Sequence, residues 1–485
     1  MPASSTFDTA LRALLGDSGV LSTGTGLDEA LAPYLNDWRG RYQGQALAIA
    51  RPSTTEEVTA VVRLCVNHGV SIVPQGGNTS LVGGSVPDNS GGQLLLNLQR
   101  LRRVRATDAA NLSLTVEAGC TLHDVQTAAE AAGLLFPLSL ASQGSCTIGG
   151  NLASNAGGTQ VLRYGTAREL CLGLEVVTAQ GEVWSGLTGL RKDNTGYDLR
   201  DLFIGSEGTL GIITAATLRL YPRPRGQATA LLACADLDAA VALLGLVRNE
   251  LDAGLTAFEV MARLPLQLVQ RHHPEVAAVL AGLQSQAGEP PPAWVVLIEN
   301  TSSESDTHAQ ERLQSVLSHA LQLGLITQAT PASNQRQQRA MWQLRETIPL
   351  SERAEGLMVK HDIGLPISAI PPFVRATAQT LNTRWPDARI VCFGHLGDGN
   401  LHYNVQPPTQ HAHGKALQEF ETQVNELVFD QVERYEGTLS AEHGIGVLRR
   451  DELARRKSSI ALSMMRSIKQ ALDPSGLMNP GRVLP

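Results

Sequence analysis

The sequence has few cysteines, few aromatic residues and no long apolar run. Its six cysteines are widely spaced and form no Cys-x-x-Cys pair, so we expect free thiols in a reducing compartment and no disulfide framework. No apolar stretch approaches the roughly 20 residues that span a bilayer. The first residues also lack the basic segment and apolar core of a secretory signal. We therefore expect a cytoplasmic protein without a transmembrane segment.

The sequence also has no excess of positive charge and lacks two common nucleotide-binding signatures. The formal net charge is −7 and the sequence pI is about 6.0, which gives no support to a nucleic-acid partner. No G-x-G-x-x-G lies between a strand and a helix with an acidic residue about 20 positions later. No G-x-x-x-x-G-K-[ST] occurs either, so the usual nicotinamide-dinucleotide fingerprint and the ATP P-loop are both excluded.

Glycine, in contrast, is abundant, with 46 residues. Three segments concentrate it, at positions 74–84, 144–158 and 205–214. Paired glycines let backbone N–H groups approach an anionic ligand, and neighbouring Asn, Ser and Thr residues add neutral donors. One such loop alone is more often a tight turn. Three within one stretch of chain predict a cradle that holds a pyrophosphate with little positive charge.

Two histidines flank the tightest turn signal in the chain. Asp398-Gly399 is the dipeptide that two-residue hairpin loops prefer, and counting outward from it places His395 opposite His402. Opposite residues have Cβ atoms about 4.5–5.5 Å apart. Glu442 offers a third ligand, as in catalytic zinc sites that keep one position open. Alternatively, both histidines are ordinary polar residues near a turn.

The pattern of apolar and turn residues predicts a mixed chain of several domains. A strand at 47–50, a helix that starts with a capping box at Ser53 and Glu56, and a strand at 70–73 make a βαβ-like opening. The closely spaced Pro222 and Pro224 break helix and sheet alike. We therefore divide the chain into segments 1–222, 223–430 and a helical segment 431–485.

These motifs together resemble a known family. The three glycine-rich loops, the segments 394–404 and 442–446, and Asn479-Pro480-Gly481-Arg482 are similar to those of the flavoproteins named after vanillyl-alcohol oxidase and para-cresol methylhydroxylase. Within that superfamily the chain resembles the FAD-linked D-2-hydroxy-acid dehydrogenases over roughly residues 47–485. The resemblance implies an α+β fold with a two-subdomain FAD-binding domain (1–222). A substrate- and metal-binding domain with an antiparallel sheet (223–430) follows, and C-terminal helices (431–485) return to the FAD domain to complete the active site.

The resemblance implies FAD held by the glycine-rich loops. Some relatives attach FAD covalently through a His directly after a Gly-Gly pair. Here Asn78 follows Gly76-Gly77, and an amide cannot form that bond, so we expect non-covalent FAD. Ile213 is expected to contact the cofactor, and Asn479 to close its site. The implied cofactor residues are Pro74, Gln75, Gly76, Gly77, Asn78, Thr79, Ser80, Ser142, Gly144, Thr147, Gly149, Gly150, Asn151, Ser154, Asn155, Gly208, Ile213 and Asn479.

The resemblance also implies roles around the histidines. A divalent metal, with zinc preferred, would bind His395, His402 and Glu442 and lower the pKa of a substrate hydroxyl as a Lewis acid. His443, next to a ligand, is the expected general base, because an imidazole transfers protons near neutral pH.

Three further residues are expected to bind the substrate. Arg345 and Lys360 match family positions that grip carboxylates, Arg345 through two parallel bonds. Asn404 lies two residues after His402 and shares its face. Without the family, each cation is more often part of a surface salt bridge. Some relatives have a hydroxyl residue four positions after the Arg, where this chain has Pro349, with Ser351 two further on.

The implied reaction is the oxidation of a D-2-hydroxy acid to the 2-oxo acid, with hydride transfer from C2 to flavin N5. D-2-hydroxyglutarate is the first choice of substrate, before D-lactate or glycolate. An electron-transfer flavoprotein or a quinone-linked chain would accept the electrons, and a homodimer is an expected assembly. One alternative is a metal-dependent hydrolase, which leaves the glycine-rich loops without a purpose. Another is an inactive flavin-binding subunit of a larger oxidase complex, which would not need the metal ligands or His443. Within the family, the alternatives are a D-lactate dehydrogenase and a glycolate oxidase flavin subunit.

Overall fold

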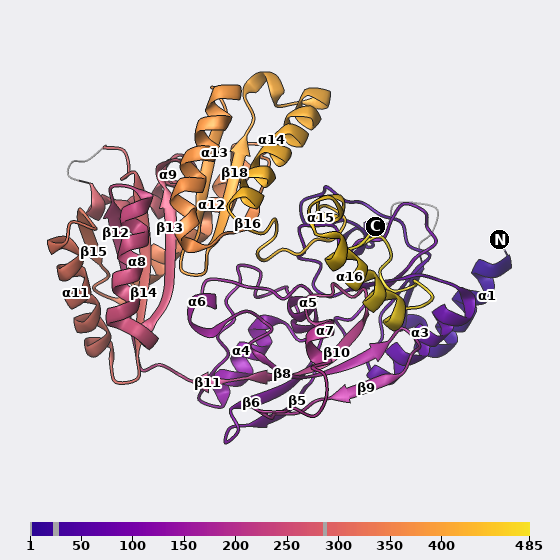
Figure 1. Cartoon of the computed structure of the whole chain (residues 1–485). Helices are drawn as coiled ribbons and strands as arrows, with labels where there is room; N and C mark the ends of the chain where they lie inside the picture. The colour runs from indigo at the N-terminus through magenta and orange to yellow at the C-terminus, as the bar shows by residue number, and fades with distance from the viewer. Residues whose placement is uncertain (1, 23–28, 285–288) are drawn as a thin grey trace. The chain divides into compact units, whose positions relative to one another are not determined.

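The computed structural model describes residues 2–22, 29–284 and 289–485 (Figure 1). The chain divides into two compact units. The first unit comprises Met1–Gly157, Gly165–Pro222 and Glu442–Pro485, and the second comprises Gly158–Tyr164 and Arg223–Ala441. The sequence predicted three segments, with boundaries at residues 222 and 430. That three-segment division differs from these two units and remains a prediction.

One sheet of the first unit is mixed and small. Its strands β1 (Val20–Ser22), β2 (Ala48–Ala50), β3 (Ile72–Gln75) and β4 (Leu94–Asn97) have the order β1-β2-β4-β3, with β2 and β3 parallel to β4. Helices α1 (Pro2–Leu15) and α3 (Thr55–His68) share a hydrophobic core with it. The predicted capping box at Ser53 and Glu56 is wrong by one residue. Thr54 is the N-cap and accepts a hydrogen bond from the Glu57 N–H, which satisfies one of the open donors at the helix start.

The second sheet of the first unit is antiparallel. Strands β5 (Val104–Asp108), β6 (Ser113–Glu117), β10 (Gly211–Arg219), β8 (Cys171–Thr178) and β9 (Val183–Gly186) lie in that order. Helix α4 (Leu122–Ala131) and the short helices α5 (Ile148–Ala153) and α7 (Arg200–Phe203) belong to this part of the unit. A short pair, β7 (Leu134–Leu135) and β11 (Tyr221–Pro222), completes it.

The last segment of the chain returns to the first unit. It carries α15 (Arg450–Arg456) and α16 (Ser459–Leu472). Beyond them, Met478 forms a parallel bridge with Ile72, and the Asn479 N–H donates to the Ile72 carbonyl at 2.8 Å. Residues near the end of the sequence therefore complete the edge of a sheet whose strands lie near its beginning.

The second unit is built on a seven-stranded antiparallel sheet. In spatial order its strands are β15 (Gln328–Pro331), β12 (Gly226–Cys234), β14 (Trp294–Ser302), β13 (Leu255–Ala262), β17 (Arg389–His395), β18 (Asn400–Gln406) and β16 (Asp362–Gly364). The strands alternate sides as the pleat requires. For example, Val296 and Ile298 of β14 enter one core, whereas Val295 and Leu297 enter the other.

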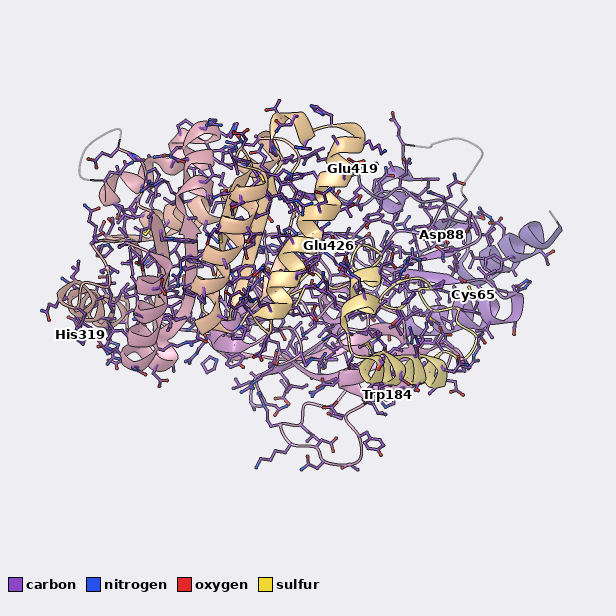
Figure 2. All side chains as sticks on the ribbon, turned by 45° about the horizontal axis from the view of Figure 1, so that its top comes forward. Cys65, Asp88, Trp184, His319, Glu419 and Glu426 are labelled. Atoms are coloured by element: carbon purple, nitrogen blue, oxygen red, sulfur yellow. The ribbon has the colours of Figure 1, made fainter. Side chains whose placement is uncertain are left out.

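Helices cover both faces of this sheet. One core includes α8 (Leu237–Leu251), α11 (Asp306–Gln322), α13 (Ile370–Arg384) and α14 (Gly414–Arg434), and the other includes α9 (Arg263–His272) and α12 (Gln335–Ala354). Helix α14 shows the amphipathic pattern behind this arrangement. Its Phe420 and Val424 are buried, whereas Glu419 and Glu426 are exposed on the outer side (Figure 2).

The structure confirms the predicted α+β class, the antiparallel sheet of the second unit and the return of the C-terminal helices. All six cysteines are buried free thiols. Among the described residues, none of the helices has the length and apolar composition that crossing a bilayer requires.

Candidate active site

The hairpin of β17 and β18 carries both histidines, but its register differs from the predicted one. His402 lies opposite Phe393, so the predicted pairing of His402 with His395 through a two-residue loop at Asp398-Gly399 is wrong by two positions. A shift of two keeps every side chain on its face of the sheet, because side chains alternate with a period of two. The two imidazoles therefore still meet, with ring centroids 5.6 Å apart.

The connection between β17 and β18 is longer than the predicted two-residue loop, and tertiary contacts explain the difference. The Gly397 N–H donates to the Phe258 carbonyl of β13 at 3.2 Å. A Cβ atom at Gly397 would lie 2.8 Å from the Leu162 side chain. The loop is thus held by the neighbouring strand and by the short helix α6 (Val161–Tyr164), which a reading of the local turn signal alone does not include.

Strand β13 supplies a residue that the sequence did not single out. The Glu259 carboxylate accepts hydrogen bonds from His395 Nδ1 at 2.6 Å and from Arg345 Nε at 2.8 Å. Glu259 is fully buried. Burial alone would raise its pKa, but His395 and Arg345 outweigh that effect and hold the pKa below its usual value. With Nδ1 on the carboxylate, Nε2 is the ring atom that His395 would offer to a metal.

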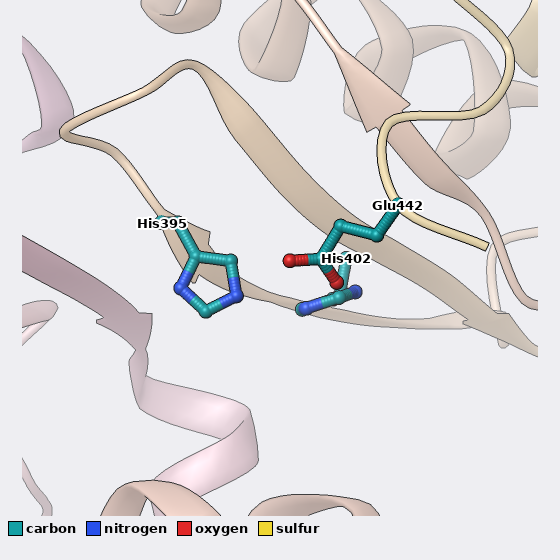
Figure 3. Close-up of side chains that lie close together, drawn as sticks. All are labelled: His395, His402 and Glu442. Carbon is teal, nitrogen blue, oxygen red and sulfur yellow. The ribbon is translucent and has the colours of Figure 1, made fainter. Parts of the chain in front are cut away.

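His395, His402 and Glu442 lie close together (Figure 3). One ligand atom of each lies within 4.8 Å of the others. Glu442 directly follows Ala441, whose N–H donates to the Asp362 carbonyl of β16 at 3.1 Å. Chain continuity therefore delivers Glu442 beside the hairpin. Two imidazoles and a carboxylate are a donor set that suits a divalent metal with one open position.

His443 belongs to a second, overlapping group of this kind. Ligand atoms of Asp362, Glu442 and His443 also lie within 4.8 Å of one another. Asp362 pairs with His402 across β16 and β18, and its Oδ1 is 4.0 Å from His402 Nδ1. The structure thus brings the predicted base and the predicted metal ligands together.

Each predicted substrate cation is paired with a buried glutamate. Arg345 is held by Glu259, whereas Lys360 Nζ lies 2.7 Å from Glu352. Asn404 Nδ2 donates to the same Glu352 carboxylate at 2.5 Å. Arg345 and Glu352 are seven positions apart on α12, so they lie on one face of the helix.

Arg345 does not fit the description of a surface salt bridge. The residue is 6% exposed, and its guanidinium lies 4.7 Å from the centroid of the Phe393 ring. Pro349 lies inside the same helix, and the Ser351 hydroxyl donates to the Thr347 carbonyl at 3.1 Å. The Ser351 hydroxyl is therefore used within the helix, and Pro349 offers no side-chain donor to a ligand.

In the first unit, the loop at residues 76–81 presents a row of open backbone donors. Within the described part of the chain, none of the N–H groups of residues 76–81 donates to a protein acceptor. A Cβ at Gly77 would lie 1.9 Å from the Ser145 carbonyl oxygen, and one at Gly76 would lie 2.3 Å from Thr147 Oγ1. Only glycine permits this approach of the first loop to the second. Such a row of N–H groups is an anion cradle.

Two predicted cofactor residues use their side chains within the protein. Gln75 Nε2 donates to the carbonyls of Tyr34 and Ser85, at 2.8 and 2.9 Å. Asn78 has a positive φ of 53°, and its Nδ2 donates to the Asn36 carbonyl at 2.7 Å. These side chains shape the loop, so a contact with FAD would come from their backbone.

Two other polar atoms are buried and have no partner among the described residues, Thr147 Oγ1 and Asn479 Oδ1. Asn479 Nδ2 donates to the carbonyls of Gly84 and Glu207, at 3.0 and 2.8 Å. Orphaned buried polar atoms next to an open N–H row fit a bound polar ligand such as FAD. The other predicted cofactor residues lie in this unit as well: Pro74, Thr79, Ser80, Ser142, Gly144, Gly149, Gly150, Asn151, Ser154, Asn155, Gly208 and Ile213.

Glu259 and Glu352 are the residues that the sequence analysis missed. A signal existed for each. Glu259 is the one charged residue of the apolar strand β13, and a buried charge needs a partner. Glu352 follows Arg345 at a helical spacing of seven. Neither signal names the partners, and for Glu259 both come from distant parts of the chain.

Comparison with known proteins adds independent information. Residues 46–186 match the model of an FAD binding domain, and residues 223–483 match the C-terminal domain of FAD linked oxidases. The chain is 38% identical over 454 residues to the D-2-hydroxyglutarate dehydrogenase of Xanthomonas citri pv. viticola, which covers 93% of this chain and 92% of that protein. It is 39% identical over 458 residues to the mitochondrial D-2-hydroxyglutarate dehydrogenase of Bos taurus, over 94% of this chain and 80% of that protein.

A solved structure of p-cresol methylhydroxylase with substrate bound has a TM-score of 0.76 at 18% identity. The alignment covers 100% of this chain and 97% of that chain. At this identity the likeness shows the fold alone.

Proposed function

The chain belongs to the family of FAD-linked oxidases, and we propose that it oxidises D-2-hydroxyglutarate to the 2-oxo acid with FAD as the hydride acceptor. The similarity to D-2-hydroxyglutarate dehydrogenases over more than nine-tenths of the chain carries the proposal. The alternative of a metal-dependent hydrolase leaves the FAD-binding match at residues 46–186 without a role.

FAD would be held without a covalent bond. The open N–H groups of residues 76–81 would face its pyrophosphate, and Thr147 and Asn479 would supply further polar contacts. When bound, the flavin supplies the acceptor for the hydride that leaves C2 of the substrate.

A divalent metal, preferably zinc, would be held by His395, His402 and Glu442 and would act as a Lewis acid toward the substrate hydroxyl. The charges of the surrounding residues support a cation there. Arg345 and Lys360 are positive, whereas Glu259, Glu352, Asp362 and Glu442 are negative. The residues alone thus carry two excess negative charges, which repel an anionic substrate. A divalent ion would cancel that excess.

The protein residues then divide the work of binding and proton transfer. Arg345 uses Nε for Glu259, so its two terminal nitrogens are the ones that would grip the substrate carboxylate. Glu259 orients Arg345 and His395 together. His443 would take the proton of the substrate hydroxyl as the C2–H bond breaks. Asn404 uses its amide toward Glu352 and the His361 N–H, so we assign it the positioning of Glu352 and Lys360.

D-lactate is a second candidate substrate, because α12 has Pro349 where some relatives have a hydroxyl residue, and the Ser351 hydroxyl donates within the helix. Lys360 would then carry that contact for D-2-hydroxyglutarate. Steady-state kinetics with both acids would distinguish them. A kcat/KM at least tenfold higher for D-lactate would reject D-2-hydroxyglutarate as the preferred substrate.

The proposed reaction is tested with purified protein under anaerobic conditions. The protein should carry the yellow absorbance of oxidised flavin, and D-2-hydroxyglutarate should bleach it while the L enantiomer does not. A colourless preparation, or a flavin that no D-2-hydroxy acid reduces, would overturn the proposal.

The metal site is tested by substitution. His395→Ala should lose both bound metal and turnover. The matched control is His319→Ala, because His319 is half-exposed and pairs with Glu250 in another part of the unit. Unchanged metal content in His395→Ala would refute the ligand assignment.

Three further expectations remain part of the proposal. Reduced flavin would be reoxidised by an electron-transfer flavoprotein or a quinone-linked chain. The protein would act in the cytoplasm and form a homodimer. Reoxidation of the reduced flavin by an added electron-transfer flavoprotein or by a quinone, cell fractionation and light scattering test these points in turn.

A further inference from the structure

The third glycine-rich loop contains a partly buried carboxylate that the proposed reaction does not use. Glu207 Oε1 accepts a hydrogen bond from the Ile445 N–H at 2.7 Å, and Oε2 accepts one from the Gly446 N–H at 2.8 Å. Both donors belong to the turn that directly follows Glu442 and His443. Hydrogen bonds from backbone N–H groups to a carboxylate are stronger than those between neutral groups.

The turn is shaped to fit this carboxylate. Gly444 and Gly446 have positive φ angles of 81° and 51°. A Cβ at Gly444 would lie 2.8 Å from Glu207 Oε1, and one at Gly446 would lie 2.3 Å from the Val82 carbonyl oxygen. The Val447 N–H also donates to that carbonyl, at 2.9 Å. The backbone of the turn is therefore pressed against Glu207 and Val82 at positions where only glycine fits.

Glu207 is itself fixed from two sides. Its N–H donates to the Ala153 carbonyl at 2.8 Å, and its carbonyl accepts from Asn479 Nδ2 at 2.8 Å. Its φ of 53° is unusual for a residue with a side chain. The surroundings thus hold the backbone of Glu207 in a conformation that aims its carboxylate at the turn.

Glu442 and His443 lie between two backbone anchors. On one side the Ala441 N–H is bound to the Asp362 carbonyl, and on the other the N–H groups of Ile445 and Gly446 are bound to Glu207. Glu207 is the only side chain that provides the second anchor among the described residues.

We propose that Glu207 is a positioning residue that fixes Glu442 and His443 through the turn that follows them. The assignment rests on the proposed function for the roles of those two residues. Groups that orient metal ligands from outside typically change metal affinity or activity about 10- to 100-fold when they are removed. Loss of Glu207 should act on the metal ligand and on the base together, because one turn carries both.

The test uses Glu207→Ala and the milder Glu207→Gln in the full-length FAD-loaded protein. The amide oxygen of Gln accepts one N–H, but its NH₂ group faces the other donor, so its effects should lie between those of wild type and Ala. The matched control is Glu169→Gln. Glu169 also accepts a backbone N–H, from Thr166 at 2.8 Å, in the same unit but in a different loop.

Three readouts separate positioning from loss of structure. Amide hydrogen exchange at Ile445 and Gly446 should speed up about 10- to 100-fold in Glu207→Ala. Zn²⁺ should bind the metal-stripped variant about 10- to 100-fold more weakly. With Zn²⁺ saturating, kcat should fall about as much while KM for D-2-hydroxyglutarate stays within about threefold. FAD content should match that of the control.

Wild-type exchange at Ile445 and Gly446 in Glu207→Ala would overturn the inference. So would fast exchange with wild-type Zn²⁺ affinity and kcat, because the anchor would then not govern the site. Failure of the proposed function looks different. A wild-type protein without turnover of D-2-hydroxy acids or without Zn²⁺ binding would reject that function, and exchange at the two amides would still decide whether Glu207 anchors the turn.

Discussion

Glu259→Gln is the substitution whose consequences the structure defines most sharply. Glu259 is fully buried and lies between His395 Nδ1 and Arg345 Nε. Glutamine keeps the shape and removes the charge. Its carbonyl oxygen can accept from one partner only, and its NH₂ group then faces the other. Arg345 stays charged, because a guanidinium does not lose its proton in proteins.

The expected effects follow from these contacts. Removing one partner of a buried ion pair costs about 3–5 kcal/mol of unfolding free energy, since the other charge stays buried. For a unit of this size, about 2–4 °C of melting temperature is lost per kcal/mol, so we expect a drop of roughly 6–20 °C. Zn²⁺ affinity should fall about 10- to 100-fold, because His395 loses the carboxylate that orients its ring.

A second buried glutamate of the same sheet provides the control. Glu299 is 3% exposed and accepts hydrogen bonds from Thr256 and Trp342, both at 2.8 Å, and from Gln227 at 2.5 Å, all of them neutral. Burial raises its pKa, so replacement of the charged form by an amide should be well tolerated. We expect Glu299→Gln to change stability by about 1 kcal/mol and to leave Zn²⁺ affinity unchanged.

The assay combines thermal unfolding of both variants with Zn²⁺ titration of the metal-stripped proteins. The reasoning is refuted if Glu259→Gln and Glu299→Gln melt within about 2 °C of each other. It is also refuted if Glu259→Gln binds Zn²⁺ as tightly as the wild type, because the carboxylate would then not orient His395.

Three further predictions concern other parts of the chain. Gly77→Ala should abolish FAD retention, measured by absorbance after gel filtration, since its Cβ would lie 1.9 Å from the Ser145 carbonyl oxygen; normal flavin content would contradict it. His443→Ala should keep FAD and lower kcat about 10²- to 10⁴-fold, and near-normal turnover would exclude it as the base. Burial would raise the pKa of Glu355, but hydrogen bonds from groups such as Arg389 lower it to about 2. Glu355→Gln should therefore destabilise by about 1–3 kcal/mol above about pH 5, and the difference from wild type should vanish as pH falls toward about 2; urea unfolding at several pH values tests this.

The sequence alone predicted that the two hairpin histidines meet, and this prediction held although the predicted loop was wrong. The Asp398-Gly399 signal gave the wrong loop, yet the shift of two positions preserved the face on which His395 and His402 lie. A shift of one position would have placed them on opposite faces. Alternation is thus a more robust guide to which side chains meet than the exact loop type.

Residues whose role depends on contacts between distant parts of the chain could not be predicted from the sequence. His395 and Glu259 are 136 positions apart, and Asn404 and Glu352 are 52 apart. No local pattern encodes such a pair, because the order of β13 and β17 in the sheet brings the partners together. Glu442 could be proposed as a ligand from its chemistry and from the family motif, but the turn signal says nothing about the position of a residue more than 40 positions beyond it.

The bridge between Met478 and Ile72 has a consequence for how a ribosome makes this protein. Strand β3 emerges early in translation, but its neighbour at Met478 is synthesised some 400 residues later, and at about 5–20 residues per second that interval lasts at least about 20 seconds. During that time the β3 edge of the incomplete sheet exposes unpaired backbone N–H and C=O groups, which can pair with a wrong strand. The growing chain therefore cannot complete this sheet edge until Met478 has been synthesised. Chaperones have that interval in which to shield the edge.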